Sequence, residues 1–178
     1  PLLDLLARLL NVMGSSMFPL VIAPLVYWSV SKRLGLQMAL MLLAGGLIAF
    51  VIKQAAQTPR PFVAHPDEVN ALFEVDGYGL PSGHVITALM SLLPVVVWLK
   101  DQRWWWAYGA FVLVMGWSRM YSGMHYPQDV MASLLLGAVL IAWYMHHPPG
   151  MDVLHHGALI AGALIVPWFL AVSYTHLR

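Results

Sequence analysis

The chain has 178 residues, of which 60% are hydrophobic and 10% are charged, and its formal net charge is +1. A soluble domain has about 45–50% apolar and about 25% charged residues, so this chain has too few charges to cover a water-facing surface. Soluble globular and disordered chains are therefore excluded, and there is no basic field to attract nucleic acid. The chain contains no cysteine, which excludes disulfides and cysteine-ligated metal sites. We expect one all-α membrane domain over residues 1–178.

Apolar runs separated by polar turns predict a polytopic transmembrane helical bundle of about five to six spans. Residues 2–13 are apolar except for Asp4, Arg8 and Asn11. These three share one helix face, which predicts a short helix lying in the membrane interface. The later apolar runs predict the spans, which are residues 18–30, 36–56, 85–99, 104–120, 130–145 and 158 onward.

The basic residues predict an orientation, because short cytoplasmic loops are enriched in Lys and Arg. Two short loops on one side of the predicted bundle carry Lys32, Arg33, Lys100 and Arg103. That side should be cytoplasmic, so the long acidic loop after the second span faces outward. Lys53, Arg60 and Arg119 lie at the outer end instead, where few counter-charges are present. This departure from the rule predicts a bound anion.

Three short blocks supply the polar side chains of this outer end, and each block lies at a helix end near the same membrane depth. They can therefore share one pocket. The blocks are Lys53 to Arg60-Pro61, Pro81-Ser82-Gly83-His84, and Ser118-Arg119 with His125 and Asp129.

The residue types in these blocks suit a phosphate group. Arg60 and Arg119 offer a planar fork to two oxygens, and Lys53 offers a compact positive charge. Ser82 and Gly83 begin a helix, so backbone N–H groups and the helix dipole face the anion. The glycine also lets the backbone approach a ligand closely.

The two histidines suit phosphoryl transfer. One histidine can attack phosphorus if its other ring nitrogen donates to a carboxylate, and Asp129 lies one helical turn beyond His125. A second, protonated histidine can donate a proton to the leaving oxygen, and His84 fits this role. The three cations would stabilise the charge on the equatorial oxygens, so we expect no metal and no cofactor.

These blocks match the pattern K-x6-RP, PSGH and SR-x5-H-x3-D at every specified position, and the chain thus resembles the type 2 phosphatidic acid phosphatase (PAP2) superfamily. The resemblance implies a six-helix bundle with these motifs at the outer membrane face. It implies that His125 forms a phosphohistidine, that Asp129 orients it, and that His84 is the general acid and later helps to activate water. The residues that would hold the phosphate are Lys53, Arg60, Ser82, Gly83 and Arg119.

The resemblance also bears on the ends of the chain. The motif core covers residues 53–129, and the first span that is usual in the family would precede the interfacial helix. Since Pro1 is not an initiator, we expect an N-terminally truncated fragment. Residues 152–178 would add an extra, incomplete span.

The function that follows is hydrolysis of a lipid phosphate in the membrane, without a nucleic-acid partner. By resemblance, the candidate substrates are undecaprenyl pyrophosphate, phosphatidylglycerol phosphate and phosphatidic acid, and a bacterial inner-membrane enzyme would face the periplasm. Two alternatives are transfer of the phosphate to another lipid and non-catalytic binding of a lipid or anion. The pairs His146-His147 and His155-His156 do not share a helix face, so we expect no metal site there.

Overall fold

The computed structural model describes residues 2–73, 75–150, 152–153 and 156, and every secondary-structure element in this part of the chain is a helix. The all-α fold class is therefore confirmed. The predicted sixth span lies outside the described residues. The helices are α1 (Leu2–Gly14), α2 (Met17–Ser29), α3 (Lys32–Ala56), α4 (Pro61–Ala64), α5 (Gly83–Leu99), α6 (Gln102–Tyr121) and α7 (Pro127–His146).

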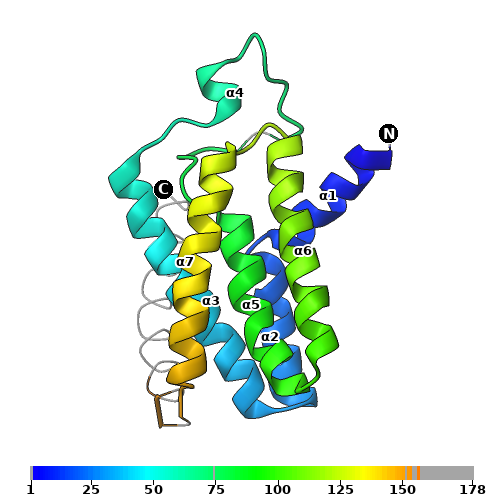
Figure 1. Ribbon diagram of the computed structural model, residues 1–178, viewed down its shortest axis with the longest axis vertical. Helices are drawn as coiled ribbons and strands as arrows, with labels where there is room; N and C mark the ends of the chain where they lie inside the picture. Colours follow the sequence, from blue (N-terminus) through cyan, green and yellow to red (C-terminus); the bar gives the residue numbers. More distant parts are fainter. Residues whose placement is uncertain (1, 74, 151, 154–155, 157–178) are drawn as a thin grey trace, which may run out of the picture.

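Helix α5 is the centre of the bundle, where it packs against α1, α3, α6 and α7 (Figure 1). Its sequence is apolar on all sides, which is typical of a helix that other helices surround. Its buried side chains include Val85, Met90 and Leu93, none of which is exposed to any measurable extent. The remaining long helices run along the same axis, and α4 lies above them at one end (Figure 1).

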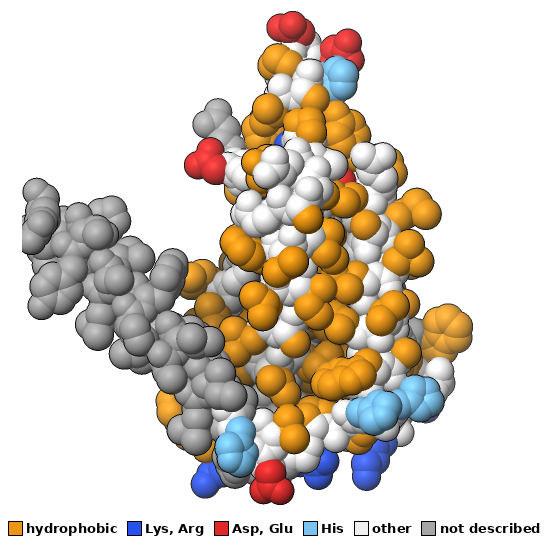
Figure 2. Space-filling model, turned by 90° about the vertical axis from the view of Figure 1, so that its left-hand side faces the viewer, with side chains coloured by type: hydrophobic (Ala, Val, Ile, Leu, Met, Phe, Trp, Pro, Cys, Tyr) orange, Lys and Arg blue, Asp and Glu red, His pale blue; other side chains and the backbone are white. Residues whose placement is uncertain are grey.

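Two segments of the described part are long and apolar enough to cross a membrane, namely α7 and Lys32–Ala64, which comprises α3, the non-helical residues 57–60 and α4. A third crossing is possible if α1 and α2, which meet at a bend of 55°, form one span. Helix α5 is apolar but has only 17 residues. The expected number of five to six spans is thus not confirmed by length and composition. Hydrophobic side chains cover the middle of the visible face while charged groups gather at its two ends, as in an integral membrane protein (Figure 2).

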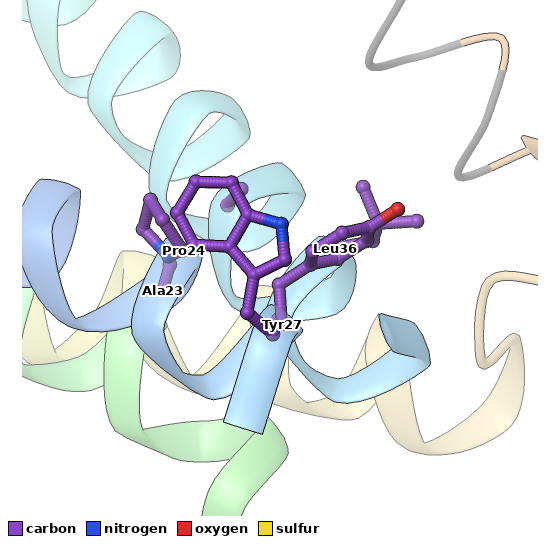
Figure 3. Close-up of a pocket in the computed structure, with 7 residues that line it drawn as sticks. Ala23, Pro24, Tyr27 and Leu36 are labelled. Atoms are coloured by element: carbon purple, nitrogen blue, oxygen red, sulfur yellow. The ribbon is translucent and has the colours of Figure 1, made fainter. Parts of the chain in front are cut away.

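Close packing of α2 on α3 depends on Gly35. A Cβ at this position would lie 2.5 Å from the Tyr27 Cβ and 2.7 Å from the Ala23 carbonyl oxygen. Beside this contact is an apolar hollow of about 290 Å³ (Figure 3). Ala23 and Pro24 of α2 lie on one side of it, and Leu36 of α3 lies on the other. The contact fixes the lower half of α3 and thereby the position of its upper end.

The upper end of the bundle brings the three motif blocks together. There α3 ends, α5 begins, α6 ends and α7 begins (Figure 1). The chain between α3 and α5 passes over this end and includes the short helix α4. The predicted convergence of residues from Lys53 to Asp129 is therefore present in the fold.

Candidate active site

Ser133 connects the beginning of α5 to the beginning of α7. The backbone N–H of Ser82 donates to Ser133 Oγ at 2.8 Å and lies 3.3 Å from the carbonyl oxygen of Asp129. The hydroxyl of Ser133 lies 2.8 Å from the same Asp129 carbonyl. These bonds fix two motif blocks against each other. Ser133 is not among the residues that the motifs predict, although it follows Asp129 by one helical turn and so shares its face.

The pair of His125 and Asp129 has the geometry predicted for a histidine nucleophile. His125 Nδ1 is 3.3 Å from Asp129 Oδ2, and the residues are 5% and 0% exposed. The same carboxylate oxygen accepts the backbone N–H of Tyr126 at 3.0 Å, which fixes the carboxylate at the start of α7. With its proton on Nδ1, the ring has a free electron pair on Nε2.

The other side of the His125 ring contacts Arg60. Arg60 Nη1 lies 3.3 Å from His125 Nε2, and the same nitrogen donates to the Met124 carbonyl at 3.3 Å. Arg60 Nε donates to the Gly77 carbonyl at 3.0 Å. Arg60 therefore connects the segment after α3, the loop before α5 and the loop that carries His125. A positive charge stands beside the nitrogen that would bond to phosphorus.

Burial lowers the pKa of His125, and this effect outweighs the hydrogen bond to Asp129, which acts in the opposite direction. The positive charge of Arg60 lowers the pKa further. The imidazole is therefore neutral at neutral pH, which is the form that can act as a nucleophile.

Lys53 organises the loop that precedes Ser82. Its Nζ donates to the carbonyl oxygens of Tyr78, Gly79 and Pro81 at 2.8, 3.2 and 2.8 Å. An ammonium group has three donors, so all of them are used within the protein in this structure. The motif predicts a phosphate ligand at Lys53, whereas the structure places it against backbone oxygens.

Arg119 is 1% exposed and is held mainly by α1. Its Nη1 donates to Asn11 Oδ1 at 2.7 Å, its Nη2 lies 3.4 Å from the Ala7 carbonyl, and its Nε donates to Ser118 Oγ at 3.3 Å. The guanidinium also lies over the Phe73 ring, 5.6 Å from its centroid. The polar face predicted for residues 2–13 thus includes a direct partner of a motif arginine, a role that the sequence alone does not reveal.

Three motif residues carry buried polar atoms without a partner. Among the described residues, the only such side-chain atoms are Ser82 Oγ, His84 Nε2 and Asp129 Oδ1. Buried polar groups are nearly always hydrogen-bonded, so orphans of this kind call for an explanation such as a missing ligand. A Cβ built on Gly83, between two of these residues, would meet no atom within 4 Å. Free space and unsatisfied polar atoms therefore coincide at the start of α5.

A cavity of about 660 Å³ opens between α4 and residues 75–78. Arg60 lines it together with Phe62, Val63 and Val75. Because Arg60 also contacts His125, the side chain of Arg60 connects this cavity to the His125 ring. The lining combines apolar side chains with the buried cation of Arg60 and the exposed carboxylate of Asp76, and the cation suits an amphipathic molecule with an anionic end.

The fold and the site define a helical membrane protein with a buried histidine–aspartate pair and several buried cations. The model of the PAP2 superfamily matches residues 34–150, so the chain belongs to this family. It is similar to the undecaprenyl-diphosphatase BcrC of Bacillus subtilis, with 32% identity over 98 residues, 55% of this chain and 49% of the relative. An undecaprenyl-diphosphatase of Sulfolobus acidocaldarius is 28% identical over 123 residues, 66% of this chain and 57% of the relative.

The fold agrees with this assignment. The crystal structure of Aquifex aeolicus LpxE superimposes with a TM-score of 0.72 and 21% identity, covering 82% of this chain and 87% of that chain. The chain spans about half the length of the curated relatives it matches. In the part of the chain that the structure describes, no group of three or more His, Asp or Glu side chains could hold a metal ion.

Gly83→Ala tests whether the free space at the start of α5 receives an anion. The methyl group meets no protein atom, so the fold should be kept, but it should occupy the space of the ligand. We expect at least about tenfold weaker binding of inorganic phosphate, equivalent to about 1.4 kcal/mol, measured by thermal shift in detergent. Gly109→Ala is the matched control, since its Cβ also meets nothing within 4 Å. Equal phosphate affinity in both variants would contradict this assignment.

Proposed function

We propose that this chain is a lipid-phosphate phosphatase that works through a phosphohistidine at His125. The observation that carries the proposal is the position of this ring, with Nδ1 3.3 Å from Asp129 Oδ2 and Nε2 3.3 Å from Arg60 Nη1. A site that only bound an anion would not need an oriented, neutral imidazole beside a cation. Membership of the PAP2 superfamily supports the same reaction class.

In the first step, Nε2 of His125 attacks the terminal phosphorus, and the bond between this phosphorus and the leaving oxygen breaks. The leaving oxygen belongs to the lipid alcohol in a phosphomonoester and to the lipid monophosphate in a pyrophosphate. Asp129 accepts the Nδ1–H bond and stabilises the charge that develops on the ring. His84 in its protonated form donates a proton from its unpartnered Nε2 to the leaving oxygen. Burial and the nearby cations lower the pKa of His84, so this role requires the negative charge of the bound phosphate to favour its protonation. Arg60 and Arg119 stabilise the charge on the phosphoryl oxygens.

In the second step, water attacks the phosphohistidine. His84 takes a proton from the water, the phosphorus–nitrogen bond breaks, and inorganic phosphate leaves with His125 restored. The orphaned hydroxyl of Ser82 and the open position at Gly83 accommodate the phosphoryl group in both steps. Lys53 contributes by shaping the loop before Ser82, and its charge reaches the phosphate if one of its carbonyl bonds is exchanged.

Undecaprenyl pyrophosphate is the first candidate substrate, because two relatives are named undecaprenyl-diphosphatases. Phosphatidylglycerol phosphate and phosphatidic acid are the other candidates. We place the chain in a bacterial inner membrane as a bundle of five to six spans, with the site facing the periplasm. The basic residues at the opposite end of the bundle support this orientation.

Phosphate release in detergent micelles with EDTA tests the proposal. Phosphate release from each of the three candidate lipids is measured for the wild-type protein and for His125→Ala. We expect the rate of release to fall about a thousandfold or more in the variant. His65→Ala is the matched control, because this histidine is exposed at the same end of the bundle. Turnover that survives in His125→Ala would remove it as the nucleophile. Release that rises with an added lipid acceptor would indicate phosphotransfer, and binding without turnover would indicate a carrier.

The pH dependence of kcat/KM follows from the lowered pKa of His125. Protonation would block the nucleophile, and burial shifts this protonation below the ordinary value of 6.5. Activity should therefore persist as the pH falls through 6.5, and the midpoint of the acid limb of the profile should lie below pH 6.5. A midpoint above 6.5 would show that the ring is stabilised in its charged form, contrary to the burial argument.

Asn11→Ala tests whether α1 positions Arg119. The change removes the acceptor of the 2.7 Å bond and leaves a buried charged donor without its partner. Hydrogen bonds to charged groups contribute about 1.5–3 kcal/mol to the stability of the arrangement that they hold. Loss of this bond should leave Arg119 poorly positioned, so kcat/KM should fall by at least about tenfold. Asn11→Asp retains an acceptor and should restore most of the activity. Asn70→Ala, on an exposed loop, is the control, and a similar loss there would contradict a specific role for Asn11.

A further inference from the structure

A second polar cavity lies at the end of the bundle opposite the candidate active site. Its volume is about 320 Å³, and it is enclosed where α3 begins and where α5 and α7 end. The length of α5, 17 residues, separates it from the catalytic motifs by about 25 Å along the helix axis. Lysine and arginine side chains gather at this lower end of the molecule (Figure 2). None of the motif residues lines it.

The walls of this cavity carry two cations from different elements. Arg33 comes from the first turn of α3, and Lys100 caps the end of α5. Among the described residues, no carboxylate forms an ion pair with either of them. The carboxylate nearest in sequence, that of Asp101, instead accepts the backbone N–H of Arg103 at 2.9 Å and caps α6. Both positive charges are therefore available to an anion.

Buried polar groups line the inside of the cavity. Tyr144 is 2% exposed and lines the cavity, and its hydroxyl is not one of the enclosed unpartnered atoms of the described residues. Gln37 is 8% exposed, and its amide nitrogen makes one long contact of 3.5 Å with the Pro149 carbonyl. Gln37 and Tyr144 therefore place polar groups in the wall of the cavity, where they can bond to a ligand.

The backbone at Lys100 is unusual and favours a role for its side chain. Its φ and ψ are 55° and 19°, the left-handed conformation that is typical of glycine at the end of a helix. Only Gln57 and Lys100 adopt positive φ among the described residues other than glycine. This conformation costs an L-residue energy that glycine would avoid. The left-handed conformation directs the Lys100 side chain from the end of α5, where it lines the cavity.

We propose that this cavity binds the phosphate headgroup of an anionic phospholipid in the leaflet at that end of the bundle. The groups facing it are mostly donors, namely a guanidinium, an ammonium and a hydroxyl, together with the start of α3, whose dipole favours an anion. Pro94, Val97 and the half-exposed Trp98 form the apolar wall beside them. Basic pockets between membrane helices are known to hold anionic lipid headgroups. The site is distinct from the proposed phosphatase site.

Thermal unfolding in detergent with added lipid tests this proposal. Phosphatidylglycerol should raise the melting temperature by roughly 5 °C at saturating concentration, whereas phosphatidylcholine should not. Inorganic phosphate binds at the candidate active site, so any shift that it causes should be the same in the wild-type protein and in the Arg33 and Lys100 variants. The shift should persist in His125→Ala, which separates this site from the catalytic one. It should be lost in Lys100→Gly, a change that suits the left-handed backbone and therefore keeps the fold, and in Arg33→Gln.

Lys32→Gln and Arg103→Gln are matched controls, because they remove cations at the same end that do not line the cavity. They should retain the wild-type shift. The proposal is overturned if Lys100→Gly and Arg33→Gln keep the shift, or if the controls lose it equally, because bulk charge would then be responsible. It is also overturned if phosphatidylcholine stabilises the protein as well as phosphatidylglycerol does.

Discussion

The buried carboxylate of Asp129 is the constraint on which the site depends. It is fully enclosed at the start of α7, where it accepts the backbone N–H of Tyr126 and lies beside the Nδ1 atom of His125. The same residue therefore caps a helix and orients a side chain, and it determines which nitrogen of the ring is free. A buried carboxylate must be compensated by hydrogen bonds or cations, and Lys53 and Arg60 supply positive charge nearby.

The cations of the site supply positive charge and also fix the surrounding loops through hydrogen bonds. Lys53 bonds to three carbonyls and Arg60 bonds to two, so the loops before α5 and α7 are built on charged side chains. These loops place the unpartnered atoms of Ser82 and His84 beside the open position at Gly83. In a low-dielectric environment such preorganised donors stabilise developing negative charge effectively. The same contacts would therefore serve both folding and catalysis.

Much of the fold could be predicted from the sequence because membrane helices are long apolar runs. The prediction of 36–56 corresponds to α3, which begins a few residues earlier at Lys32 after its Ser31 cap. The prediction of 130–145 corresponds to α7, which begins at Pro127. Both helices begin with polar residues, so hydropathy alone assigns these residues to turns. The proline in the first turn of α7 is instead typical of a helix start.

The motifs also predicted the His125–Asp129 pair, because a separation of four residues fixes it locally. Contacts between distant segments could not be predicted in the same way. Asn11 and Arg119 are 108 positions apart, and no local pattern connects them. The carbonyl partners of Lys53 depend on backbone directions in a loop, which residue types do not reveal. The motif explained why a cation is present but not what it contacts.

The central claim is that His125 carries the phosphoryl group between substrate and water. Rapid acid-free quenching during turnover of undecaprenyl pyrophosphate, followed by peptide mass spectrometry, tests it directly. The account predicts an acid-labile phosphoryl group on His125 that forms and decays at rates compatible with turnover. A phosphoryl group on another residue, or turnover without any phosphorylated intermediate under conditions that preserve phosphohistidine standards, would contradict it.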